Sequence, residues 1–165
     1  YNFHDVVKEA GVQGFTEPDP KIDLSGVDVA RKILILIRES GYQMEMEQIE
    51  NNCFLPDECM QTTNNDDFFT SLIKHENHFN QLLKEAQAKD SRIKFVASFD
   101  NGKAAVGLQF IPKESPFYNL EGKDNIVEFY TDRYVDQPLI IKGAGAGAAV
   151  TASGIFADVV RIGNV

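Results

Sequence analysis

The feature that most constrains this chain is an acidic, proline-containing loop followed directly by an apolar helix. The loop, Thr16 to Pro20 (TEPDP), has prolines at alternate positions, which exclude both helix and β-ladder and hold the residues before them extended. A helix then runs to about Ser40, with Asp23 or Ser25 as its expected cap. Apolar residues surround it almost completely between Val27 and Ile37. Such a helix is expected to be buried on most sides.

The remaining pattern predicts an α+β fold with a mixed or antiparallel sheet covered by helices on one face. Asp100-Asn101-Gly102 lies between two strand-like runs and is typical of a hairpin turn. The other expected elements are a helix over 6–10, a strand within 44–55, a polar loop over 51–65, one long amphipathic helix over 66–86, strands at 93–99, 104–111, 126–130 and 138–142, and a final helix over about 149–162.

Composition and charge narrow the classes of partner. A length of 165 residues fits one domain over 1–165, and a net charge of -9 makes nucleic acid and anionic membrane surfaces poor partners. Two cysteines, Cys53 and Cys59, are too few for a disulfide framework, and no signal peptide is recognisable. We therefore expect a cytoplasmic protein with free thiols. Because residue 1 is not Met and a helical pattern begins at once, we also expect an excised portion of a longer protein.

Four charged residues at the loop and the helix could carry chemistry. Asp28 and Lys32 are four apart and share one helix face, next to the loop that carries Glu17 and the nearby Asp23. One interpretation is an ordinary surface ion pair. The other is a site for a zwitterion, in which carboxylates bind an ammonium group and the lysine faces an oxygen where a proton moves. The apolar helix suggests that the pair is partly buried, which weakens the first interpretation, but from spacing alone the zwitterion site is the less favoured of the two.

Three weaker patterns are better explained by structure. Residues 143–148 fit a dinucleotide fingerprint, but no second strand can follow in the remaining length, so a tight turn that a ligand could approach closely is expected. His75-Glu76-Asn77-His78 is one residue short of a zinc-protease motif, so a solvated helix face is expected. Cys59 and a distant histidine have no local support as a nucleophilic pair.

Two long segments resemble the homoserine dehydrogenase family. They are GFTEPDPKIDLSGVDVARK (14–32), with Lys21 where arginine is usual, and PLIIKGAGAGAAVTASGIFADVVRI (138–162). The resemblance implies a catalytic domain for the NAD(P)H-dependent reduction of L-aspartate 4-semialdehyde to L-homoserine, in threonine and methionine biosynthesis. The sequence of residues 129–141, and an end soon after the final helix, look more like the bifunctional aspartokinase–homoserine dehydrogenases.

The resemblance also assigns residues and partners. It implies substrate binding by Glu17, Asp28 and Asp23, general acid catalysis by Lys32, and backbone contact with the cofactor at Gly14 and Gly147. It places the Rossmann domain and the family's metal site outside this chain, so no metal is expected and the chain alone should be inactive. Residues 143–165 are expected to pack with that upstream nucleotide-binding domain, and the sheet is expected to form a homodimer. The alternative is a dimerisation or structural module that binds no ligand of its own.

Overall fold

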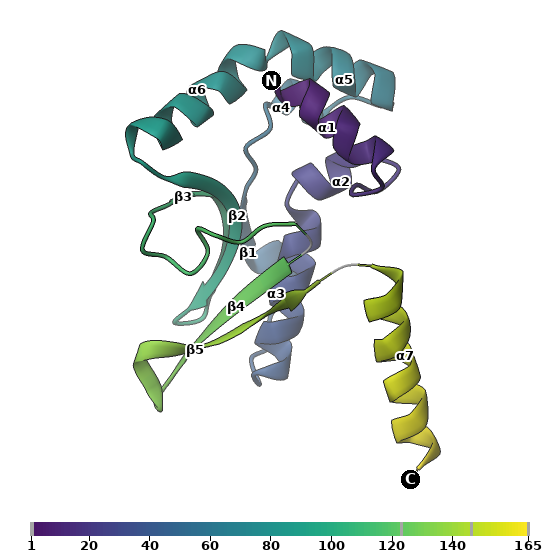
Figure 1. Ribbon diagram of the computed structural model, residues 1–165, viewed down its shortest axis with the longest axis vertical. Coiled ribbons are helices and arrows are strands. Elements are labelled where there is room, and N and C mark those ends of the chain that lie inside the picture. Colours follow the sequence, from purple (N-terminus) through teal and green to yellow (C-terminus); the bar gives the residue numbers. More distant parts are fainter. Residues whose placement is uncertain (1, 123, 146, 165) are drawn as a thin grey trace. The chain divides into compact units, whose positions relative to one another are not determined.

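The computed structural model describes residues 2–122, 124–145 and 147–164, in two units, Tyr1–Lys113 and Glu114–Val165. The first unit contains α1 (Phe3–Val12), α2 (Pro20–Leu24), α3 (Val27–Glu39), the short 3₁₀ helix η1 (Met46–Gln48), β1 (Ile49–Asn52), α4 (Asp57–Met60), α5 (Asn65–Lys74), α6 (Glu76–Ala88), β2 (Arg92–Asp100) and β3 (Lys103–Ile111) (Figure 1). The second contains β4 (Asp124–Thr131), β5 (Tyr134–Ala144) and α7 (Ala148–Gly163).

A mixed three-stranded sheet with one helix packed against it forms the lower part of the first unit. Its order is β1–β3–β2, with β1 parallel and β2 antiparallel to β3. One stripe of α3, made of Ala30, Leu34 and Ile37, is buried against the sheet, where Val106 of β3 is 1% exposed. Phe95 of β2 packs at the edge of this core. The predicted α+β class, with a mixed sheet and a helix on one face, is confirmed.

The start of α3 differs from the prediction that Asp23 or Ser25 caps it. Asp23 lies inside the separate short helix α2, Ser25 ends α2, and Gly26 is the N-cap of α3. Gly26 has a φ of +81°, and a Cβ there would lie 2.5 Å from Cζ of Phe95. Only glycine combines this left-handed backbone with so close an approach to the sheet. The close packing, which the local sequence does not show, therefore decides where α3 begins.

The helices α1, α4, α5 and α6 form a second core, which appears above the sheet in Figure 1. Its buried residues are Val7, Leu55, Cys59, Phe68, Leu72 and Phe79. Two predictions are wrong here: α4 lies inside the expected polar loop, and the expected long helix over 66–86 is two helices that meet at His75. Both α5 and α6 contribute to this core, and the break changes their direction so that each can do so.

The predicted hairpin is present, and so are the two further predicted strands. The turn between β2 and β3 has Asn101 at φ +48° and Gly102 at φ +79°, the left-handed pair that a type I′ turn requires. In the second unit β4 and β5 pair antiparallel, and the predicted final helix is α7. The large apolar side chains of α7 are exposed, with Phe156 at 68%. None of the helices in the described ranges is long and apolar enough to span a bilayer.

Candidate active site

The acidic loop is anchored by its own short helix. Asp19 caps α2, its Oδ1 accepting the backbone N–H of Lys21 at 3.0 Å, and Pro20 occupies the first helical position, where a missing N–H costs nothing. The backbone N–H of Glu17 donates to Oδ2 of Asp23 at 2.8 Å. Asp23 therefore lies next to Glu17, but one of its oxygens is already engaged in shaping the loop.

Asp28 and Lys32 form an ion pair in the first two turns of α3. Oδ2 of Asp28 is 2.8 Å from Nζ of Lys32, and the two side chains are 46% and 55% exposed. Asp28 is thus partly buried, whereas the expectation that the helix is buried on most sides is wrong, because α3 buries only one stripe and Ile35 is 60% exposed. An exposed pair contributes about 1 kcal/mol or less to stability. Both groups are thus open to a ligand, and little stability is lost if they change partners.

The two predicted cofactor glycines lie in different units, and each has a conformation that favours glycine. Gly14 has a φ of +74°, and a Cβ there would meet nothing within 4 Å. Gly147 has a φ of +123° and is the N-cap of α7. Ala146, in the same glycine run, lies outside the described residues. At Gly145 a Cβ would lie 1.8 Å from Nδ2 of Asn125, so the turn packs tightly against β4.

A second set of contacts, which sequence reasoning missed, holds the acidic loop from outside. Nζ of Lys21, a side chain only 14% exposed, donates to the carbonyl of Thr62 at 2.6 Å. Nδ2 of Asn65 donates to the carbonyl of Pro18 at 2.8 Å. Thr62 and Asn65 lie more than 40 positions along the chain, so no local pattern could have found them. An asparagine pair before a helix predicts only a cap, and Asn64 is indeed the cap of α5.

The segment from His75 to His78 has structural roles, and it is not simply a solvated face. The ring nitrogen Nδ1 of His75 lies 3.0 Å from the carbonyl of Ser71, and the histidine ends α5. Oε1 of Glu76 accepts the backbone N–H of Phe3 at 2.8 Å, and Oε2 lies 3.1 Å from Nδ1 of His4. Burial raises the pKa of Glu76, but these hydrogen bonds outweigh it, so the net pKa is lowered.

Cys59 lies close to His75, but the geometry does not make it a nucleophile. Its Sγ is 3.9 Å from Nδ1 of His75 and accepts a hydrogen bond from Oγ of Ser71 at 3.2 Å. Since Nδ1 must donate its proton to the Ser71 carbonyl, it cannot accept one from the thiol. Burial, the largest effect, raises the pKa of Cys59. Within the described ranges, no three His, Cys, Asp or Glu side chains gather as metal ligands.

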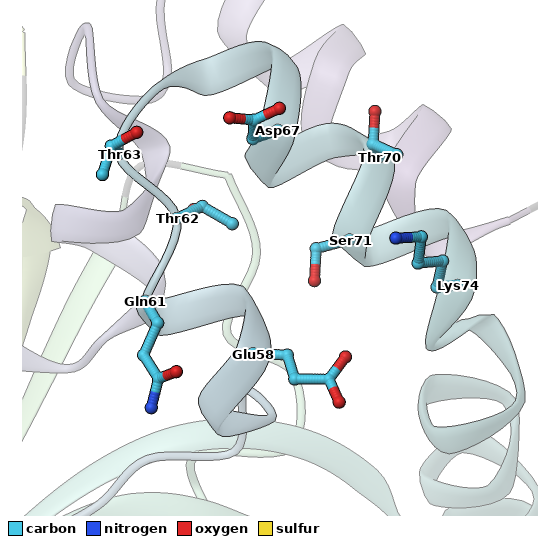
Figure 2. Close-up of a pocket in the computed structure, with 8 residues that line it drawn as sticks. All are labelled: Glu58, Gln61, Thr62, Thr63, Asp67, Thr70, Ser71 and Lys74. Carbon is cyan, nitrogen blue, oxygen red and sulfur yellow. The ribbon is translucent and has the colours of Figure 1, made fainter.

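An open polar pocket of about 380 Å³ is formed by α4, α5 and the segment between them (Figure 2). It is lined by Glu58, Gln61, Thr62, Thr63, Asp67, Thr70, Ser71 and Lys74. None of the predicted site residues lines it. Its link to the acidic loop is Thr62, whose carbonyl accepts the Lys21 hydrogen bond.

Comparison with known proteins places this arrangement in a family. The family model for homoserine dehydrogenase matches residues 1–160. The chain is 42% identical over 164 residues to bifunctional aspartokinase/homoserine dehydrogenase 1, chloroplastic, of Zea mays, covering 98% of this chain and 18% of that protein. It is 38% identical to homoserine dehydrogenase of Schizosaccharomyces pombe, covering 98% of this chain and 44% of that protein.

Solved structures give the same result at the level of fold. A Candida auris protein of unknown function superposes with a TM-score of 0.88 and 36% identity, over 99% of this chain and 46% of that one. Homoserine dehydrogenase of S. aureus superposes with a TM-score of 0.71 and 23% identity, over 99% and 37%. This chain thus spans less than half the length of these relatives. The chain belongs to the homoserine dehydrogenase family.

Proposed function

We propose that this chain is the substrate-binding and catalytic part of an oxidoreductase that reduces L-aspartate 4-semialdehyde to L-homoserine with NAD(P)H, in threonine and methionine biosynthesis. The observation that carries the proposal is the exposed Asp28–Lys32 pair at 2.8 Å, next in sequence to a short helix that anchors the loop carrying Glu17. All of these residues lie in the part of the chain that the family model matches.

The proposed roles follow from charge and position. Glu17 and Asp28 bind the ammonium group of the amino acid. Asp23 is the third carboxylate of the site, and it also accepts the backbone N–H of Glu17. Oδ1 of Asp28 is available for this, because Oδ2 faces Lys32. Lys32 donates a proton from Nζ to the aldehyde oxygen, which becomes the hydroxyl of homoserine. NAD(P)H, when bound, supplies the hydride to the carbonyl carbon, so charge and atoms balance.

The cofactor is proposed to touch this chain through backbone only. Gly14 offers an open surface free of Cβ, and Gly147 is exposed at the start of α7. Neither contact supplies a charged group for phosphates, so we propose that an upstream nucleotide-binding domain makes most of the contacts with the cofactor. We also propose that residues 143–165 pack with that domain. The exposed apolar side chains of α7, such as Phe156 and Ile155, support this.

A homodimer through the three-stranded sheet is part of the proposal. The strand residues that alternate with the α3-facing ones are Val96, Ser98, Ala105, Gly107 and Gln109, and they line a shallow hollow with Asn52. Small side chains on a sheet face allow a second sheet to approach closely. Since Cys53 and Cys59 are free thiols, we further propose a reducing compartment, the cytoplasm.

The test is homoserine-dependent reduction of NAD⁺ or NADP⁺ by the full-length protein that carries this chain. Asp28→Asn should raise KM for homoserine by about 10- to 100-fold, because a charge-assisted hydrogen bond is lost. Asp57→Asn, which changes an exposed carboxylate in the first turn of α4, is the matched control and should leave KM unchanged. No hydride transfer with either cofactor would refute the proposal.

The second candidate is a structural or dimerisation module without a ligand. It is favoured by the fact that Asp28 and Lys32 already satisfy each other within the chain. Calorimetry of the chain with homoserine separates the two candidates. Binding heat that disappears in Glu17→Ala and Lys32→Ala supports the substrate site, and no heat from the unsubstituted chain supports the structural module.

A further inference from the structure

We propose that Asn65, the first residue of α5, is a positioning residue. It would set the affinity of the site for its substrate by holding the backbone of the loop that carries Glu17. This inference rests on the proposed function. It starts from the backbone of the loop that carries Glu17. Pro18 and Pro20 have no N–H, so few backbone hydrogen bonds can fix this segment.

Two hydrogen bonds hold the segment around Glu17, one at each end. On one side, Asp23 accepts the N–H of Glu17 at 2.8 Å. On the other side, Asn65 donates Nδ2 to the carbonyl of Pro18, the next residue, at 2.8 Å. The two-residue segment Glu17–Pro18 is therefore held at both ends, at the N–H of Glu17 and at the carbonyl of Pro18. Removing the Asn65 amide leaves the carbonyl end without this partner.

Asn65 is itself held in place by the packed helix α5. It is the first residue of α5, whose cap, Asn64, accepts the N–H of Asp67 at 2.9 Å. One turn further along α5, Phe68 is fully buried in the helical core, and so is Leu72. A second hydrogen bond joins the start of α2, next to the loop, to the segment before α5, since Nζ of Lys21 donates to the carbonyl of Thr62 at 2.6 Å. Asn65 thus transmits the position of a packed helix to an otherwise irregular loop.

The kinetic consequence can be separated from a loss of stability. Glu17 contacts the ammonium group equally in the ground state and in the transition state, because that group does not react. An interaction of this kind changes KM and leaves kcat largely unchanged. Lys32 is on α3, outside the segment that Asn65 holds. We therefore expect a change in affinity for homoserine, with the proton-transfer step preserved.

The experiment compares Asn65→Ala and Asn65→Asp with Asn77→Ala in the full-length protein. Asp has the shape of Asn without the amide donor, and Asn77 is an exposed asparagine in the first turn of the neighbouring helix α6. Both Asn65 variants should raise KM for homoserine by about 3- to 10-fold, the value of one exposed hydrogen bond, with kcat and the cofactor KM within about 2-fold. Asn77→Ala should match the unsubstituted protein.

Amide hydrogen exchange of the peptide covering 15–19 gives a second readout that does not depend on turnover. Exchange there should become faster in both Asn65 variants and not in Asn77→Ala. Unchanged exchange, or a Asn65→Asp variant with the original KM, would overturn the inference. An unsubstituted protein that oxidises no homoserine would instead refute the proposed function, and the exchange result would still decide the role of Asn65.

Discussion

Replacing Gly26 by alanine should be among the most damaging small changes in the first unit. Gly26 starts α3, the helix that carries Asp28 and Lys32. Its φ of +81° is left-handed, which costs a residue with a Cβ about 1–2 kcal/mol. The new Cβ would also lie 2.5 Å from Cζ and 2.8 Å from Cε1 of Phe95, an overlap that forces the ring to move.

Moving Phe95 disturbs the sheet core, and overpacking of this kind costs about 1–3 kcal/mol. The Cβ would lie 3.0 Å from Oδ1 of Asn51, whose amide donates to the Ser25 carbonyl just before the helix. Together the strain and the overlap predict a loss of about 2–5 kcal/mol in the free energy of unfolding.

Urea unfolding followed by circular dichroism measures this loss, with Gly41→Ala as the matched control. Gly41 follows α3 at its other end with a φ of +90°, but a Cβ there would meet nothing within 4 Å. Gly41→Ala should therefore cost only the backbone strain, about 1–2 kcal/mol. Adding Phe95→Leu should recover part of the loss in Gly26→Ala and none in Gly41→Ala. Equal losses in the two glycine variants would refute the steric argument.

Three further predictions concern other parts of the fold. Below the ordinary thiol pKa of about 8.5, a thiol reagent should label exposed Cys53 in the folded chain and reach Cys59 only in urea; rapid labelling of both would contradict the burial and raised pKa of Cys59. Because the folded pKa of Glu76 is lowered, its contribution relative to Glu76→Gln should be complete above about pH 4.3 and decline as the pH falls through the folded pKa; urea midpoints across that range check this, and a pH-independent difference would contradict it. Gly145→Ala should lower the melting temperature, and adding Asn125→Ala should restore part of it, whereas an unchanged melting temperature in the single variant would argue against the tight turn.

Elements with a strong local signal were predicted well from the sequence. Asn101-Gly102 defined the β2–β3 hairpin, because few residues other than these adopt the required left-handed conformations. The errors occurred where tertiary packing decides. The break at His75 depends on how α5 and α6 share one core, and the start of α3 depends on the approach of Gly26 to Phe95. Neither contact is visible in a local window of sequence.

The candidate site was only partly predictable for the same reason. The spacing of Asp28 and Lys32 predicted their pairing, and the pair is present at 2.8 Å. The burial of the helix that carries the pair was overestimated, because apolar residues around a helix indicate burial only if a partner covers each face, and within the described chain α3 buries one stripe. The contact from Asn65 could not be predicted, since it joins segments that the sequence keeps far apart.

The most direct test of the central proposal is the role of Lys32 in proton transfer. Homoserine oxidation by the full-length protein should be compared among the unsubstituted enzyme, Lys32→Ala and Arg31→Ala, the last changing an exposed cation one position earlier on α3. We predict that Lys32→Ala lowers kcat by about 10²- to 10⁴-fold with little change in the cofactor KM, and that Arg31→Ala retains activity. A Lys32→Ala enzyme with the kcat of the unsubstituted protein would contradict the account.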